Sequence, residues 1–156
     1  MKNFKILLNT LKITNYKKNI VIFFPVLFSG SIFSIKLNEL NNLLITLISF
    51  SLLTSLVYIM NDLFDKESDK LHPVKKYRPI ASGEVSTKTI VVIVMSILSI
   101  NFLFFINFNI LREVGVLFAI YFVNNVFYNL FLKRINIFIS ALVISIGFYL
   151  RILIGA

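Results

Sequence analysis

The stretch LLITLISFSLLTSLVYIMNDLFDKESD, residues 43–69, joins a long apolar run to an acidic segment. The apolar part, Leu43–Met60, is long enough to cross a hydrocarbon core of about 30 Å as an α-helix that rises about 1.5 Å per residue. Carboxylates are costly beside a bilayer, so a group of them at the end of a spanning helix indicates a functional site. This stretch therefore predicts both a membrane fold and the location of its site.

Three aspartates in this segment share a spacing that suits one helix face. At about 100° per residue, Asp62, Asp65 and Asp69 fall within an arc of about 60°, and Asn61 widens that arc to about 100°. Glu67 points to the opposite side. Three carboxylates on one stripe repel each other unless a cation lies between them. Mg²⁺ is favoured over Ca²⁺ as this cation, because protein carboxylates and substrate phosphates commonly coordinate the same Mg²⁺ ion. We therefore predict Asp62, Asp65 and Asp69 as catalytic metal ligands, with Asn61 as a substrate-binding residue.

Basic residues follow the aspartates within a few positions. Lys75, Lys76 and Arg78 are predicted to bind the phosphate oxygens of a diphosphate, Arg78 through a bidentate fork. A solvated charged loop between two spans is the alternative interpretation. His72 is the single histidine and precedes Pro73, which favours a structural loop residue over a catalytic base.

The composition predicts an all-α, polytopic helical membrane protein. The chain is 58% hydrophobic with a mean hydropathy of +0.87, far above a soluble domain. Pro25 is expected to kink the first apolar run or tilt it into the interface. With zero cysteines there is no disulfide framework or thiolate-ligated metal. We expect one membrane domain over residues 1–156, with apolar runs at Ile20–Ile35, Leu43–Met60, Ile90–Phe108, Val114–Leu132 and Ile135–Ala156.

The net charge of +9 comes from basic residues that gather in particular segments, and this distribution argues against a nucleic-acid partner. Basic residues gather before the first run, between the second and third, and after the fourth, at Lys133 and Arg134. The other side has only Lys36 and Arg112. This positive-inside bias predicts a multi-pass protein of the cell inner (plasma) membrane whose amino terminus and acidic loop are cytoplasmic.

Two cytosolic segments follow from this topology. Residues 61–88 form the predicted aspartate-rich loop. Residues 1–19 form a basic lead-in, which either lies along the leaflet as an amphipathic helix or is a poorly ordered tail. No cleavable signal peptide is apparent in these residues.

Residues 61–85, NDLFDKESDKLHPVKKYRPIASGEV, carry a resemblance to a known family. They resemble the first aspartate-rich motif, NDxxDxxxD, of the UbiA superfamily of intramembrane prenyltransferases. The continuation HPxKxxRPIAxG resembles the branch of decaprenyl-phosphate phosphoribosyltransferases. Further similar stretches are Lys18-Asn19 with Phe24-Pro25, Leu132-Lys133 and Gly147-Phe148-Tyr149-Leu150-Arg151.

The resemblance implies a UbiA-type bundle of about nine spans, of which this chain holds the amino-terminal five. Family members carry a second acidic or polar motif in a later loop. The chain alone is therefore expected to show little or no activity without the missing carboxy-terminal half, or without a homo-oligomer.

The resemblance also adds candidate residues outside the loop. It implies substrate-binding roles for Lys18, Asn19 and Lys133. Lys133 also lies where a lysine that only sets the membrane topology would lie. Tyr128 lies beside Asn125 and Asn129, and these residues either line a substrate cavity or cross-link helices. Whether Arg151 snorkels to an interface or packs inward stays open. Ser140 stands where relatives carry an acidic residue.

The resemblance favours one activity and leaves alternatives. The favoured activity is Mg²⁺-dependent transfer of a phosphoribosyl group from phosphoribosyl diphosphate to a polyprenyl phosphate, an acceptor already anionic and in no need of a strong base. One alternative is transfer of a prenyl group from a prenyl diphosphate to an aromatic or other small acceptor. Another is an inactive truncated membrane fragment. Expected partners are these lipids and membrane lipids, with no nucleic acid.

Overall fold

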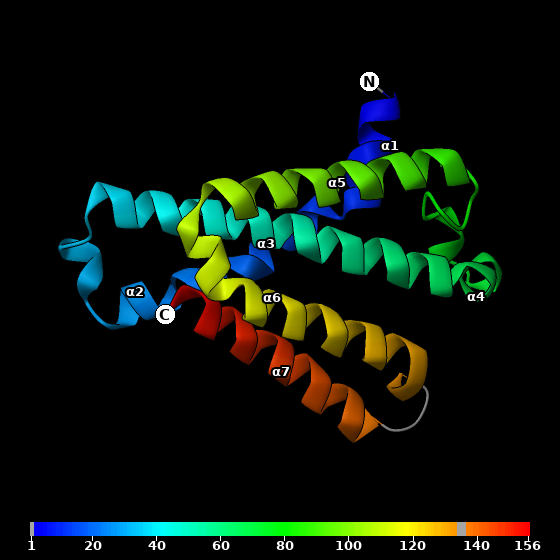
Figure 1. Cartoon of the computed structure of the whole chain (residues 1–156). Helices are drawn as coiled ribbons and strands as arrows, with labels where there is room; N and C mark the ends of the chain where they lie inside the picture. The colour runs from blue at the N-terminus through cyan, green and yellow to red at the C-terminus, as the bar shows by residue number, and fades with distance from the viewer. Residues whose placement is uncertain (1, 134–136) are drawn as a thin grey trace.

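Helix α3 (Leu37–Phe64) is the central helix of this all-α membrane protein (Figure 1). The computed structural model describes residues 2–133 and 137–156. In the most apolar window of α3, 56% of the residues are buried, against 11% in α5 (Thr87–Asn107). Helix α3 packs against α5 and α6 (Asn109–Phe127), and α6 also packs against α7, while much of the surface of α5 and α6 stays uncovered. This uncovered surface carries exposed apolar side chains, as expected of a surface that meets lipid.

Four helices in the described ranges are long and apolar enough to cross a membrane: α3, α5, α6 with its π-helical end η4 (Tyr128–Leu132), and α7 (Ile137–Gly155). They run side by side along the molecule in Figure 1. The last four apolar runs of the sequence are thereby confirmed as helices. Arg134, Ile135 and Asn136 lie outside the described residues.

The first predicted span contains no long α-helix, so within the described residues four helices, rather than five, are long and apolar enough to cross a membrane. Residues Ile13–Phe23 form a 3₁₀-helix, η1, and Phe24–Phe28 form a short helix, α2, with Pro25 in its first turn. Proline lacks the N–H and clashes with the preceding turn, so a new helix begins here, in agreement with the expected break. The apolar run is also short, and a 3₁₀-helix rises about 2.0 Å per residue, which lets few residues cover a long distance.

Hydroxyl side chains on α3 explain how η1 lies so close to it. The Asn19 amide donates to Ser51 Oγ at 3.0 Å and to Thr54 Oγ1 at 3.3 Å. Tyr16 and Ser55 share a hydrogen bond of 2.7 Å. Small polar residues of this kind let two backbones approach within a membrane and satisfy each other's polar groups. The amino-terminal segment is thus part of the bundle.

The short elements gather at the two ends of the bundle (Figure 1). One end carries α4 (Lys66–Leu71) and η3 (Lys75–Tyr77). We call it the aspartate end, because Asp62 lies there, together with Lys12 and Lys133. The opposite end carries α2, η2 (Ser31–Phe33) and the last residues of α7. Helix α1 (Lys2–Leu11) packs on α3.

Two apolar clusters hold the long helices together. Phe50 is fully buried where η1, α3, α6 and α7 meet, and its ring makes edge contacts with Phe118 and Tyr121 at 5.2 and 4.7 Å between centroids. The second cluster, around Ile59 and Ile80, joins α3 to α5 and to the loop after η3. This second cluster anchors that loop beside the carboxyl end of α3.

Gly155 lets α7 contact the backbone of η1. A Cβ atom added at Gly155 would lie 1.8 Å from the carbonyl oxygen of Ile22, whereas one added at Gly147 would meet nothing closer than 3.6 Å. We expect Gly155→Ala to lower the free energy of unfolding by about 1–3 kcal/mol through overpacking. Gly147→Ala, the control in the same helix, should be neutral or stabilising by up to about 1 kcal/mol. Thermal unfolding in detergent measures both, and equal effects would contradict the close packing.

Candidate active site

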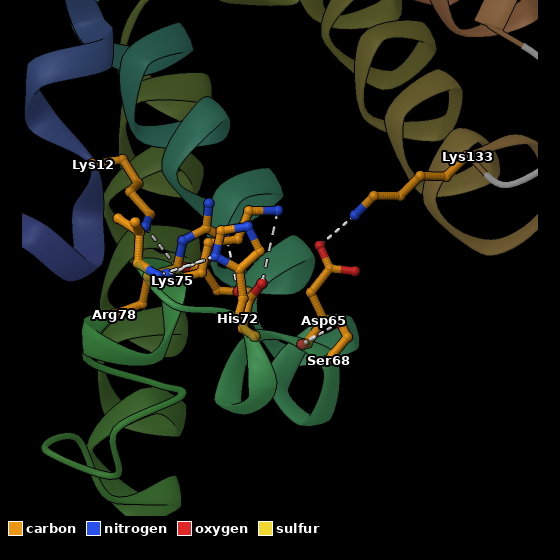
Figure 2. A network of polar contacts seen from close by, with 10 residues as sticks. Lys12, Asp65, Ser68, His72, Lys75, Arg78 and Lys133 are labelled. Atoms are coloured by element: carbon orange, nitrogen blue, oxygen red, sulfur yellow. Dashed lines mark hydrogen bonds and ion pairs between the residues drawn. The ribbon is translucent and has the colours of Figure 1, made fainter.

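The aspartate segment lies where α3 ends and the chain turns into α4. Helix α3 ends at Phe64, and Asp65 separates it from α4 with φ −89° and ψ −1°. The predicted helical stripe is therefore interrupted at its middle residue. Asp62 and Asp69 both contact Arg78. Asp65 instead points toward Lys133 (Figure 2).

Arg78 joins two of the three aspartates. Its Nη1 donates to Asp62 Oδ1 at 3.1 Å and to Asp69 Oδ2 at 2.7 Å. Both aspartates are buried, with 5% and 2% of their surface exposed. Two buried carboxylates this close need a positive charge between them, and the guanidinium supplies it. The structure thus places Arg78 beside the aspartates, and its phosphate-binding role stays a prediction.

Two lysines complete the charge balance of this pair. Lys12 Nζ lies 2.7 Å from Asp62 Oδ2, and Lys75 Nζ lies 3.9 Å from Asp69 Oδ1. Lys76 does not join them: it lies over the ring of Tyr77, 5.2 Å from its centroid. We use the name Asp–Arg cluster for Asp62, Asp69, Arg78, Lys12 and Lys75.

Sequence reasoning missed Lys12 as a site residue. It joins α1 to η1 in the left-handed conformation, with φ 53° and ψ 41°. A lysine rarely adopts this conformation, and such backbone strain concentrates at functional positions. Its closeness to Asp62 depends on a contact across 50 positions, which no local sequence pattern reveals.

The loop after α4 positions Arg78 through local hydrogen bonds. His72 Nδ1 accepts from the backbone N–H groups of Val74 and Lys75 at 3.1 and 3.2 Å, which agrees with the structural role predicted for this histidine. The Arg78 carbonyl accepts from the Ser82 N–H at 2.8 Å. Ile80, just beyond Arg78, is buried against α3 and α5. The apolar anchor therefore holds the guanidinium over the carboxylates.

Asp65 pairs with Lys133 instead of with the Asp–Arg cluster. Figure 2 shows the two side chains reaching toward each other across the gap between α3 and the end of α6. Lys133 follows the π-helical turn η4, an irregularity that often occurs at functional sites. Asp65 and Lys133 both line a cavity of about 290 Å³ that is also lined by Phe64 and Asn129.

A second cavity, of about 230 Å³, lies between α3, α6, α7 and η1. Lys18, Asn61 and Tyr128 line it together, and their substrate-binding roles stay predictions. Asn19 is buried next to it and cross-links η1 to α3 and α7. The cavity is lined by Lys18, Val57, Tyr58, Asn61, Tyr121, Asn125, Tyr128, Val143, Ile144, Gly147, Phe148 and Arg151.

The residues at the aspartate end include oxygen ligands that a hard cation prefers, but these ligands are not gathered around one point. Within residues 2–133 and 137–156, no three carboxylate or imidazole groups gather closely enough to hold a metal ion. Among the described residues, Asn61 Oδ1 nevertheless has no hydrogen-bond partner although it is buried, next to the buried Asp62. These oxygens are ligands that Mg²⁺ accepts, and the Arg78 guanidinium occupies the cationic position between Asp62 and Asp69.

The fold and this end together define a helical membrane protein with buried acidic and basic side chains paired at one end of the bundle. The sequence profile of the UbiA prenyltransferase family matches residues 22–156, and the chain belongs to this family.

Individual relatives agree with this assignment. The chain is 31% identical over 153 residues to the uncharacterized protein y4nM of Sinorhizobium fredii, covering 95% of this chain and 28% of that protein. It is 56% identical over 36 residues to a decaprenyl-phosphate phosphoribosyltransferase of Mycobacterium tuberculosis, 23% of this chain and 12% of that enzyme. It is 34% identical over 77 residues to the nodulation protein NoeC of Azorhizobium caulinodans, 48% of this chain and 24% of that protein. The matched regions thus cover well under two thirds of these relatives.

Proposed function

We propose that this chain forms part of an enzyme that transfers a phosphoribosyl group from phosphoribosyl diphosphate to a polyprenyl phosphate. The observation that carries the proposal is the buried Asp62–Arg78–Asp69 arrangement, flanked by Lys12 and Lys75. It combines hard oxygen ligands with phosphate-binding side chains at one location. Relatives named decaprenyl-phosphate phosphoribosyltransferase support the choice of substrates.

The leaving diphosphate of the donor needs charge neutralisation from both sides. Asp62, Asp65 and Asp69, with Asn61, are the residues that would hold Mg²⁺, which would stabilise the negative charge of the departing diphosphate. Arg78 already bridges two of these carboxylates, so its N–H groups are directed to the place where acidic oxygens gather. When the diphosphate arrives, Arg78 exchanges its carboxylate contacts for phosphate oxygens. Lys75 and Lys76 supply further positive charge at the rim.

The acceptor places little demand on acid–base catalysis. A phosphate is anionic at neutral pH, so its oxygen attacks the anomeric carbon without a base, and the bond from that carbon to the diphosphate breaks. This matches the aspartate end, where His72 Nδ1 already accepts two backbone hydrogen bonds. Asp65 would have to part from Lys133 to serve as a metal ligand, and both side chains line the first cavity.

The charge distribution orients the protein in this proposal. The aspartate end faces the cytoplasm, where a nucleotide-derived donor is available, and the protein lies in the cell inner membrane. The family supports a second candidate, transfer of a prenyl group to an aromatic or other small acceptor, since the matched family is described as prenyltransferases. The aromatic side chains of Tyr58, Tyr128 and Phe148 around the second cavity suit such an acceptor.

A parallel labelling experiment tests the donor. Native membranes that contain the protein, and membranes from cells with its gene deleted, are given Mg²⁺, polyprenyl phosphate and either labelled phosphoribosyl diphosphate or labelled prenyl diphosphates. We expect the phosphoribosyl label to enter lipid only where the protein is present. Label from a prenyl diphosphate on an aromatic acceptor, with none from phosphoribosyl diphosphate in lipid, would establish the second candidate instead.

A further inference from the structure

Arg151 is a buried guanidinium in the membrane-spanning part of the bundle. It has 6% of its surface exposed and lies in α7, so the inward orientation left open by the sequence is the one that the structure shows. Its Nε donates to Asn19 Oδ1 at 3.0 Å, and Asn19 in turn contacts Thr54 on α3. Thr54 lies two helical turns before Asp62, about 12 Å along α3 at about 1.5 Å per residue. Arg151 is therefore located well inside the bundle.

Every polar partner of Arg151 within the described residues is neutral. Besides Asn19, Nη1 donates to the Gly147 carbonyl at 2.8 Å and Nη2 donates to Tyr121 Oη at 2.9 Å. Its guanidinium carbon also lies 5.0–5.7 Å from the ring centroids of Phe50, Tyr121 and Phe148. Dipoles and aromatic faces offset part of the cost of burying a charge, but a counter-charge offsets more.

Arg151 differs from Arg78 in the charge of its partners. Arg78 bridges two aspartates, whereas no carboxylate in the described ranges pairs with Arg151. A guanidinium carries five N–H groups, and three of those of Arg151 are used by the contacts above. The side chain also lines the second cavity, so its positive charge borders an open space.

Lys18 adds a second positive charge to the same cavity. It is exposed on η1, and within the described residues no acidic group pairs with it. The remaining wall combines Tyr58 and Tyr128 with the apolar Val57, Val143 and Ile144. Two cations without acidic partners and a largely apolar wall suit an anionic head group that carries a hydrocarbon chain.

The cavity and the Asp–Arg cluster share one turn of α3. Asn61 lines the cavity, and the next residue, Asp62, contacts Lys12 and Arg78. Two anionic groups bound at these two places would thus lie near the same turn while contacting different cations.

We infer that Arg151 and Lys18 form a binding site for the phosphate monoester head of the lipid acceptor, separate from the diphosphate site at the Asp–Arg cluster. The identity of this ligand as the acceptor rests on the proposed function. Arg151 supplies its remaining N–H groups from within the bundle, and Lys18 supplies an ammonium group from η1. The apolar wall accommodates the first part of the lipid chain.

Ligand binding tests this site without any donor present. The detergent-solubilised protein is given polyprenyl phosphate, the uncharged polyprenol of the same length, or inorganic phosphate, and thermal stabilisation is titrated for each. We expect polyprenyl phosphate to bind at least about tenfold more tightly than either other ligand. Equal affinity for polyprenol, or equal stabilisation by inorganic phosphate, would overturn the assignment.

Variants locate the binding residues. Lys18→Gln should weaken polyprenyl phosphate binding by about tenfold and leave polyprenol binding unchanged. Lys17→Gln removes the adjacent exposed lysine of η1, which does not line the cavity, and should change neither affinity. Equal losses in both variants would show a general surface-charge effect and overturn the proposal. Arg151→Lys keeps the buried charge, and we expect its thermal unfolding without ligand to stay close to that of the parent while the preference for phosphate over alcohol falls. A retained preference would remove Arg151 from the site.

The result is separable from the test of the proposed function. Specific binding of polyprenyl phosphate with no transfer of the phosphoribosyl label would keep this site and refute the donor. Transfer of the label with no dependence of lipid binding on Lys18 would keep the function and refute this site.

Discussion

Asp62→Asn is expected to lower the rate of transfer by at least about 100-fold in membranes that contain the active enzyme. The substitution keeps the size of the side chain but removes the charge that stabilises a metal ion at the leaving group. Asp69→Asn should have a similar effect, because Asp69 is equally buried and shares Arg78 with Asp62. Asp65→Asn should also abolish transfer, since Asp65 is the third proposed ligand once Lys133 releases it.

Glu67→Gln is the matched control for these substitutions. Glu67 lies in the same segment but is exposed and pairs with Lys70 at 2.8 Å. The hydrogen bond from Lys70, together with the lysine charge, lowers the pKa of Glu67, so the substitution removes a charged carboxylate at neutral pH. We expect less than a twofold change in rate. Initial rates with labelled donor, normalised to the amount of folded protein, measure the difference. An Asp62→Asn variant as active as Glu67→Gln would refute the proposed role.

Arg78→Ala is expected to destabilise the aspartate end and to make its stability depend on Mg²⁺. Removing the guanidinium leaves Asp62 and Asp69 buried beside each other, with only the two lysines of the cluster to offset their charge. Breaking a buried ion pair costs about 3–5 kcal/mol, and since the Arg78 side chain is 32% exposed, we expect about 2–3 kcal/mol after solvent screening. Mg²⁺ should restore part of this loss, because a divalent cation can take the position between the carboxylates.

Lys70→Ala provides the comparison for Arg78→Ala. The Lys70–Glu67 pair is an exposed ion pair between neighbouring turns, and such pairs contribute well under about 1 kcal/mol. Thermal unfolding in detergent, with and without Mg²⁺, measures both variants and the parent. We expect added Mg²⁺ to raise the melting temperature of Arg78→Ala more than that of the parent or of Lys70→Ala. An Arg78→Ala protein as stable as the parent, or indifferent to Mg²⁺, would contradict the bridging role of Arg78.

Local sequence was sufficient for the spanning helices and for part of the site. The length of an apolar run is set by the thickness of a bilayer, so Leu43–Met60 predicts the body of α3 without knowledge of its neighbours. Asp62 and Asp69 are seven residues apart, close to two helical turns, and they do both contact Arg78. The spacing of Arg78 after the aspartates was likewise a local signal.

The placement of Asp65 and the path of the amino-terminal segment depended on tertiary contacts. Helical periodicity assumes an uninterrupted helix, but the chain turns at Asp65 and the side chain pairs with Lys133, 68 positions away. The run Ile20–Ile35 predicted a spanning helix, but Pro25 divides the segment and hydroxyl groups of α3 bind the 3₁₀-helix before it.

Local properties of the sequence are enough to predict a helical membrane protein of the UbiA type with an acidic and basic segment after Met60, because helix length, apolar content and motif spacing do not depend on distant residues. Which charges contact each other depends on the packing of the helices. Lys12 reaches Asp62, and Arg151 reaches Asn19 across 132 positions, through packing that no local pattern encodes. The energetic cost of burying a charge depends on the groups that surround it, and those groups come from distant parts of the chain.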